Sequence, residues 1–92
     1  MKIDYDSVKN QANIGKHGLD FEDVAYLDWD TGVFDIDDRK IYGETRFVAY
    51  LVREGRLYVV CFTMRDSCLR IISFRKANKR EEKYYEEKTS TN

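Results

Sequence analysis

The fold is decided by the stretch RFVAYLVREGRLYVVCFTM, residues 46–64. It holds two runs rich in β-branched and aromatic residues, which favour strands over residues 46–52 and 56–64. Glu54 and Gly55 separate the runs, and glycine tolerates the positive φ that a tight hairpin turn needs. We therefore expect an antiparallel hairpin at the centre of a sheet.

Two further runs extend this sheet. Residues 69–74 form a third strong strand pattern, and residues 33–36 form a short one among acidic residues. The long runs are apolar on both alternating faces in places, which is typical of strands covered by helices on one face and partly covered on the other. We expect an antiparallel sheet of three to four strands.

A first helix is expected before the strands. Asp6 is a plausible N-cap, the helix would run through His17, and Gly18 would take the left-handed position that follows a helix. The spacing of its apolar residues predicts an inward stripe of Val8 and Ala12, with Ile14 or Gly15.

Two more helices complete the pattern. Asp20 can cap a second helix over residues 21–27, and Asn78 can cap a last helix through about residue 88. The apolar face of the second helix would be Phe21, Val24, Ala25 and Leu27. Two N-terminal helices, a run of strands and one C-terminal helix indicate an α+β fold. The length of 92 residues predicts a single domain over residues 1–92.

The charges are unevenly distributed along the chain. The formal net charge is -1, so the whole molecule is not attracted to nucleic acid. Residues 20–38 contain eight acidic residues and no Lys or Arg, whereas residues 65–83 contain seven basic and three acidic ones. A polarised molecule can present a basic site to phosphate while remaining nearly neutral. The alternative is that folding intermixes these charges.

The composition gives no sign of a metal, a cofactor or a membrane. Cys61 and Cys68 are the only cysteines and lie in strand-like runs, so we interpret them as small buried hydrophobic residues. A zinc site would need two more ligands at close spacing. No apolar run approaches the ~20 residues of a membrane span, and no signal peptide is visible. We expect no cofactor and a cytoplasmic location.

His17 is the only histidine. Its free pKa lies near neutrality, so it is a candidate general base or acid. A histidine at the end of a helix is also a stabilising cap, and this alternative stays open. A mechanism that needs two histidines is excluded.

Arginines gather in the C-terminal third, at Arg70, Arg75 and Arg80. Guanidinium groups suit phosphate because they are always charged and donate hydrogen bonds in a fork. In a regular strand Arg70 and Arg75 point to opposite faces, and a bend after Ser73 would bring Arg75 towards Arg80. The alternative is that each arginine pairs with an acid elsewhere.

Glu44 and Arg46 open the first long strand and would share one face. They are either a structural ion pair or a base beside a phosphate-binding arginine. Six aromatic residues are candidates to stack on bases, although strand positions favour a core role for most of them: Tyr50, Tyr58, Phe62, Phe74, Tyr84 and Tyr85.

Four segments, in this order, resemble the BrnT family of toxins over about residues 5 to 87. They are Tyr5-Asp6 with Lys9, Asn13 and Lys16-His17-Gly18; Phe21-Glu22; Gly43-Glu44 with Arg46; and Arg70-Ile71-Ile72-Ser73-Phe74-Arg75-Lys76-Ala77 with Arg80-Glu81 and Tyr84. The chain departs from the family pattern at Tyr5 and Ser7, which replace Trp and Pro, and at Phe74, which replaces a small residue. These departures bear on local packing and partner fit.

The resemblance implies a RelE-like fold and a ribonuclease toxin of a type II toxin–antitoxin system that inhibits translation. It also implies an RNA substrate and a BrnA-like antitoxin with a ribbon-helix-helix domain. Operator DNA would be bound through that antitoxin, because this chain carries no DNA-binding signature of its own.

RNA supplies its own nucleophile, the 2′-OH, so cleavage needs a base, cations and an acid but no metal. We assign Arg75 and Arg80 to charge stabilisation, supported by Lys16, Arg46 or Arg70. Glu44 or His17 is the candidate base, and Tyr84 or a cationic side chain the candidate acid.

This hypothesis requires the C-terminal guanidinium groups to converge around one hollow. If the arginines lie apart, each paired with a carboxylate, the ribonuclease hypothesis fails and only the architecture remains. The alternative function is a non-catalytic module of the same fold that docks on a partner protein.

Overall fold

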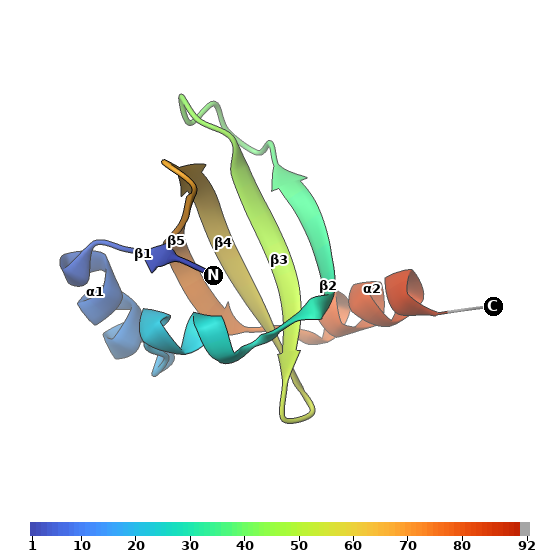
Figure 1. Cartoon of the computed structure of the whole chain (residues 1–92). Helices are drawn as coiled ribbons and strands as arrows, with labels where there is room; N and C mark the ends of the chain where they lie inside the picture. The colour runs from blue at the N-terminus through green and yellow to red at the C-terminus, as the bar shows by residue number, and fades with distance from the viewer. Residues whose placement is uncertain (91–92) are drawn as a thin grey trace.

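The expected hairpin forms the centre of a five-stranded sheet in the computed structural model, which describes residues 1–90. The strands lie in the order β1-β5-β4-β3-β2 (Figure 1). Their bounds are β1 Ile3–Asp4, β2 Asp28–Asp37, β3 Arg46–Arg53, β4 Arg56–Arg65 and β5 Cys68–Lys76. The expected strands are all present. The prediction of three to four antiparallel strands was too low, because the sheet has five strands. The short β1 pairs with β5 in parallel, so the sheet is mixed.

Two tight turns join β3, β4 and β5 into a meander. Glu54 and Gly55 have φ values of 51° and 76°, and Asp66 and Ser67 have φ values of 50° and 67°. Two consecutive residues with positive φ are typical of a type I′ turn, whose twist matches that of the strands it joins. The predicted turn at Glu54-Gly55 is therefore confirmed.

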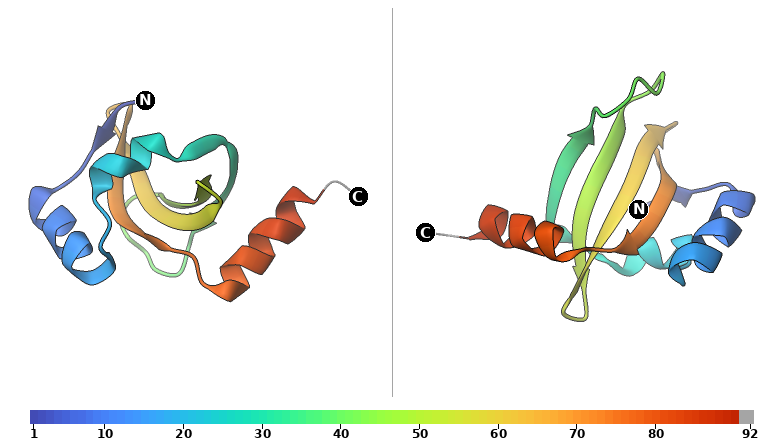
Figure 2. Two further views of the ribbon diagram at one scale, coloured as in Figure 1. Left: turned by 90° about the horizontal axis from the view of Figure 1, so that it is seen from below. Right: turned by 180° about the vertical axis from the view of Figure 1, so that it is seen from behind.

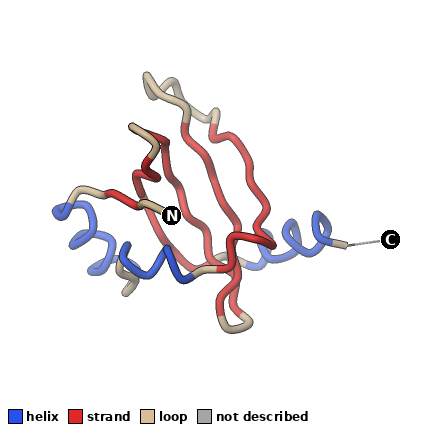
Figure 3. Tube along the Cα trace, in the orientation of Figure 1, coloured by secondary structure: helices blue, strands red, loops and turns tan. Residues whose placement is uncertain are grey.

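Three helices accompany the sheet: α1 Ser7–His17, η1 Phe21–Tyr26 and α2 Lys79–Thr89. The predicted caps Asp6, Asp20 and Asn78 each accept a backbone hydrogen bond in the first turn, and Gly18 has φ 70° after α1. Figure 3 shows α1 beside the β1–β5 edge of the sheet. Within residues 1–90, no helix is long and apolar enough to cross a bilayer.

The second helix, predicted over residues 21–27, is a 3₁₀-helix over Phe21–Tyr26. Phe21, Val24 and Leu27 are buried and recur every third residue, whereas Ala25 is exposed. A 3₁₀-helix has three residues per turn, so this spacing aligns the three side chains on one face. They point into the core.

The hydrophobic core lies between η1, α1 and one face of the sheet. Its buried residues are Phe21, Val24, Leu27, Ala49, Leu51, Val60, Phe62, Ile71 and Phe74. The side chains of β3 and β4 alternate, so Val48, Tyr50, Val59 and Cys61 lie on the opposite face. This second face is not covered by α1 or η1, and it carries the site described below.

Helix α1 does not bury the apolar stripe that was expected. Val8 is 75% exposed and Ala12 is exposed. The buried residues of α1 are instead Asn10 and Asn13. The prediction failed because the helix lies beside the edge of β5, where unpaired backbone groups need hydrogen-bond partners more than apolar cover.

The amide of Asn13 is bonded to the backbone of two other segments. It donates to the carbonyl oxygens of Phe74 (2.8 Å) and Leu19 (3.0 Å), and its Oδ1 accepts the N–H of Phe74 at 3.2 Å. The Asn10 amide accepts the N–H of Phe21 at 2.9 Å and donates to Asp20 at 3.0 Å. Both asparagines thus fix α1 to its neighbours in directed geometry.

A β-bulge in β5 changes which face its arginines occupy. Cys61 pairs with Ser73 and Phe62 with Ile71, so Ile72 is an extra residue. An extra residue shifts the alternation of side chains by one. Arg70 and Arg75 are therefore on the same face of the sheet, and the expectation for a regular strand was wrong.

Helix α2 is held on the open face by few contacts. None of its residues is buried, and the helix runs away from the sheet (Figure 2). Asn78 and Glu81 form a reciprocal capping box at its start. Tyr84 and Tyr85 donate hydrogen bonds to the Asp35 carboxylate and the Thr31 carbonyl oxygen on β2.

We expect Asn13→Ala to lower the free energy of unfolding by about 3 kcal/mol, because it leaves buried backbone groups of Phe74 and Leu19 without partners. Urea denaturation measures this loss. Gln11→Ala, at an exposed site on the same helix, should change the free energy of unfolding by about 0.5 kcal/mol or less. Equal losses in the two variants would contradict the role assigned to Asn13.

Candidate functional site

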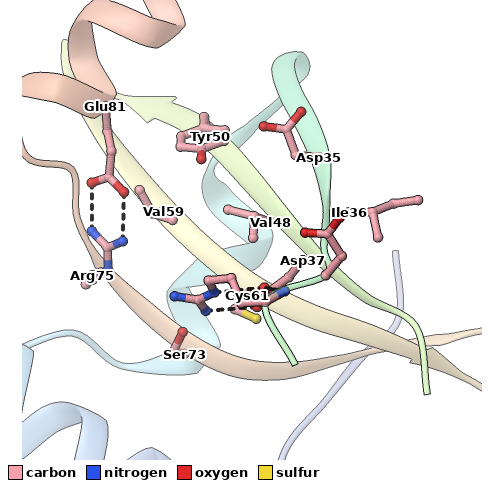
Figure 4. Close-up of a pocket in the computed structure, with 12 residues that line it drawn as sticks. Asp35, Ile36, Asp37, Val48, Tyr50, Val59, Cys61, Ser73, Arg75 and Glu81 are labelled. Carbon is pink, nitrogen blue, oxygen red and sulfur yellow. Dashed lines mark hydrogen bonds and ion pairs between the residues drawn. The ribbon is translucent and has the colours of Figure 1, made fainter. Parts of the chain in front are cut away.

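A cleft of about 310 Å³ lies on the open face of the sheet (Figure 4). Its floor is formed by side chains of the central strands, and its walls by charged groups of β2, β5 and α2. The lining residues are Asp35, Ile36, Asp37, Asp38, Arg39, Val48, Tyr50, Val59, Cys61, Ser73, Arg75 and Glu81. Four carboxylates and two guanidinium groups thus line it, so the cleft is not basic.

Arg75 forms one wall of this cleft together with Glu81. Its two Nη atoms donate to the two carboxylate oxygens of Glu81, each at 2.8 Å. The hydrogen bond from Arg75, reinforced by the N–H of Asn78, holds the pKa of Glu81 below its usual value despite partial burial. The carboxylate occupies the fork that a phosphate would use.

Arg39 and Asp37 form a second fork on the opposite wall. The Nε and Nη2 atoms of Arg39 donate to Asp37 at 2.8 and 2.9 Å, and the hydroxyl of Tyr42 donates to Asp37 at 3.2 Å. The hydrogen bond from Arg39 is the main cause that holds the pKa of Asp37 well below its usual range. The Arg39 side chain is 78% exposed, whereas the Asp37 side chain is buried.

Arg80 lines an adjoining hollow with Asp35, Tyr50, Glu81 and Tyr84. Three of these residues, Asp35, Tyr50 and Glu81, also line the first cleft. Arg75 therefore lines the cleft and Arg80 lines the adjoining hollow, and Glu81 lines both. Among the described residues, no carboxylate lies within salt-bridge distance of Arg80.

The two tyrosines of this hollow are in contact. The rings of Tyr50 and Tyr84 meet edge to face with centroids 5.3 Å apart. The Tyr84 hydroxyl donates to Asp35 at 2.7 Å, and this bond raises the pKa of Tyr84 to about 12. Of the six aromatic candidates, Phe62 and Phe74 are core residues, whereas Tyr50 and Tyr84 face the hollows.

His17 lies on the Arg75 side of the molecule. It is one helical turn after Asn13, which is bonded to Phe74, the neighbour of Arg75. Burial, then the positive charges of Lys16 and Arg75, lower the pKa of His17 from 6.5. The neutral imidazole, which can accept a proton, is therefore favoured at pH 7. Lys16 is exposed in the last turn of the same helix.

Glu44 and Arg46 lie at the other end of the sheet. Arg65 Nη2 donates to Glu44 at 2.9 Å, and Arg46 Nε lies 3.6 Å from the same carboxylate. The guanidinium of Arg46 also stacks on Tyr42, 4.0 Å from the ring centroid. Of the two alternatives left open by the sequence, the geometry is that of an ion pair, and the hydrogen bond from Arg65 lowers the pKa of Glu44.

The structure does not bring all candidate residues around one hollow. Arg46 pairs with Thr63 and Arg75 with Val59, and four residues along β4 correspond to about 13 Å. Arg70 is held at the sheet edge by Asp4 at 2.6 Å. The predicted convergence is thus limited to Arg75, Arg80 and Tyr84, which line two hollows that share Glu81, and His17 is not among the residues that line either hollow. Arg46, Arg70 and Arg75 are each paired with a carboxylate.

Two residues of the Arg80 hollow were not assigned a role from the sequence: Asp35 and Glu81. Glu81 carried a recognisable signal, because Asn78-x-x-Glu81 has the spacing of a capping box. The bond between Glu81 and Arg75 had no signal in the sequence, and Asp35 comes from a strand position without a distinguishing pattern. Tyr50, by contrast, was among the aromatic candidates to stack on bases.

With this geometry in place, comparison of the sequence with known families identifies a class of protein. Residues 5–81 match a family of ribonuclease toxins of type II toxin–antitoxin systems. The chain belongs to this family, which is named BrnT. The match ends at Glu81, so Tyr84 lies beyond it. No curated protein matches the chain.

The hydrogen bond between Tyr84 and Asp35 predicts how the pKa of Tyr84 responds to a substitution. We expect Asp35→Asn to lower the pKa of Tyr84 from about 12 towards 10.0, because the neutral amide no longer holds the phenol proton. Titration of ¹³C-labelled tyrosine by NMR measures this pKa. Tyr5, whose pKa is also about 12 through its bond to Glu22, is the internal control. An unchanged Tyr84 titration in the variant would refute the assignment.

Proposed function

We propose that this chain is a metal-independent endoribonuclease that cleaves RNA by attack of the 2′-OH and thereby inhibits translation. The match to ribonuclease toxins over residues 5–81 carries this proposal. The arginine geometry by itself does not, because Glu81 neutralises Arg75. The proposal places the reaction at the connected hollows around Glu81.

Arg75 and Arg80 would bind the scissile phosphate from two sides. The Glu81 carboxylate now occupies the fork of Arg75, and a phosphate of similar geometry can replace it there. Binding would then free Glu81 and place a guanidinium where negative charge develops in the transition state. Lys16, in the last turn of α1, would contact the neighbouring backbone.

His17 is the preferred base, because the positive charge of Arg75 acts on it. Glu44 lies at the other end of the sheet, two residues before Arg46, and is bonded to Arg65. Neutral His17 would take the 2′-OH proton while the 2′-oxygen bonds to phosphorus. The bond to the 5′-oxygen then breaks, and this oxygen takes a proton from Tyr84. The Tyr84 phenol retains its proton at neutral pH, since its pKa is about 12.

Family membership implies a protein antitoxin and an RNA substrate. We further propose that the antitoxin is BrnA-like, with a ribbon-helix-helix domain through which the complex binds operator DNA in the cytoplasm. Arg46 and Arg70 are then structural, because each forms an ion pair away from the hollows.

One observation favours a second candidate function, a non-catalytic module that docks on a partner protein. The main cleft has four carboxylates against two arginines, and both arginines are paired in forks. Such a surface repels phosphate until its ion pairs open. Cleavage assays with purified protein distinguish the two functions.

We expect Arg75→Ala and Arg80→Ala each to reduce RNA cleavage by about 10²-fold or more, because each removes a cation from the transition state. Cleavage is measured in EDTA, on variants whose circular dichroism is unchanged. Arg56→Ala, at an exposed site on β4, should retain activity. A substrate with a single 2′-deoxy position at the cut should resist cleavage. Wild-type rates in both arginine variants would reject the proposed site.

The pH dependence of cleavage tests His17. Its lowered pKa means that the rate should rise with pH through a midpoint below 6.5, as the imidazole loses its proton. His17→Gln should abolish this ascending limb. Lys16→Gln should keep the limb and move its midpoint upward, because a nearby positive charge is removed. An identical profile in His17→Gln would exclude His17 as the base.

A further inference from the structure

Within residues 1–90, the outer edge of β2 is unpaired. β2 is the last strand in the order β1-β5-β4-β3-β2 and is paired with β3. Figures 1 and 2 show no other described segment along its outer side over residues 33–37. Alternate N–H and C=O groups of such an edge point outward and can pair with an added strand. β2 contains neither proline nor lysine, two residues that commonly block such pairing.

The side chains along this edge alternate in character. Phe34 and Ile36 are 48% and 64% exposed, and Phe34 stacks on Trp29 with ring centroids 6.0 Å apart. Asp35 and Asp37 point to the other face, towards the cleft, while Ile36 points away from it (Figure 4). An apolar row and an acidic row thus run side by side along one free edge.

The acidic side chains of β2 favour a binding partner with positive charge. β2 and the residue after it carry five carboxylates, and only Asp37 is in an ion pair among the described residues. The five are Asp28, Asp30, Asp35, Asp37 and Asp38. Carboxylates at this density attract basic side chains, so the edge suits a partner segment that carries positive charge.

A second copy of the chain is also disfavoured. If two β2 strands paired antiparallel with Phe34 opposite Ile36, Asp35 of each copy would lie opposite its counterpart. Like charges directly opposite each other destabilise a strand pair. The aspartates therefore disfavour pairing of two β2 edges in this register.

We propose that the β2 edge over residues 33–37 receives an extended segment of the protein antitoxin, with side chains that alternate between apolar and basic. Apolar residues of that segment lie beside Phe34 and Ile36, and a basic residue lies beside Asp35. Main-chain hydrogen bonds provide affinity, and the alternation provides register and specificity. The proposal rests on the antitoxin partner that the family implies.

Hydrogen exchange on the complex of this chain with the antitoxin encoded in the same operon tests the proposal. We expect the amides of residues 33–37 to exchange at least about tenfold more slowly in the complex than in the free chain, because added pairing protects them. An unchanged exchange rate over these residues in a formed complex would overturn it.

Substitutions locate the contact independently. Ile36→Lys and Phe34→Lys should each weaken the affinity for the antitoxin by about tenfold or more, because each removes an apolar contact. Val8→Lys, at a more exposed aliphatic residue on α1, should leave the affinity within about twofold. If both β2 variants bind the antitoxin as tightly as the wild type, the proposal is overturned. If neither variant folds, hydrogen exchange in the wild-type complex is the deciding measurement.

RNA cleavage by the same free proteins separates this inference from the proposed function. If β2 is protected in the complex while the chain cleaves no RNA, the inference stands and the ribonuclease proposal fails. If the chain cleaves RNA and β2 remains unprotected in the complex, the ribonuclease proposal stands and the inference about β2 fails. Absence of any complex would overturn the inference and leave the ribonuclease proposal intact.

Discussion

The side-chain amide of Asn13 takes the place of a neighbouring strand beside the middle of β5. It bonds both backbone groups of Phe74, which point away from β4, where the short β1 no longer reaches. Asn10 repeats the arrangement at the start of η1. Because these bonds are directional, they fix where α1 ends, and with it the position of His17 in the last turn. The core supplies most of the stability, but these two amides determine the placement of one proposed catalytic group.

The open face combines many charges with little net charge. Each wall of the cleft is a guanidinium fork closed by a carboxylate. This explains how a protein of net charge -1 can belong to a family of ribonucleases. Both arginines of the cleft are internally neutralised, and Arg75 becomes available to an anion when that anion replaces Glu81. Such a resting state weakens non-specific attraction to nucleic acid, since that attraction depends on uncompensated cations.

Local patterns in the sequence predicted the elements, and tertiary effects decided the exceptions. The three long strands, the Glu54-Gly55 turn and the three caps follow from local chemistry. The burial of Asn10 and Asn13 does not, because Asn13 is bonded to a strand edge 61 residues away and Asn10 to the start of η1. The extra residue Ile72 is also invisible locally, yet it reverses the face of Arg70 relative to Arg75. For the site, family motifs brought out Arg75 and Arg80, whereas the pairing with Glu81 appears only in three dimensions.

Helix α2 differs from the rest of the molecule in how it is attached. It buries no residue and is joined to the sheet mainly by the Arg75–Glu81 fork and by two tyrosine hydroxyls. Polar attachments contribute little net free energy and weaken as ionic strength rises, whereas burial of a core does not. Detachment of this helix is therefore a low-energy opening, separate from unfolding of the sheet. The hollow lined by Arg80 and Tyr84 would widen with each such opening, which makes access to it a property of the salt concentration around the protein.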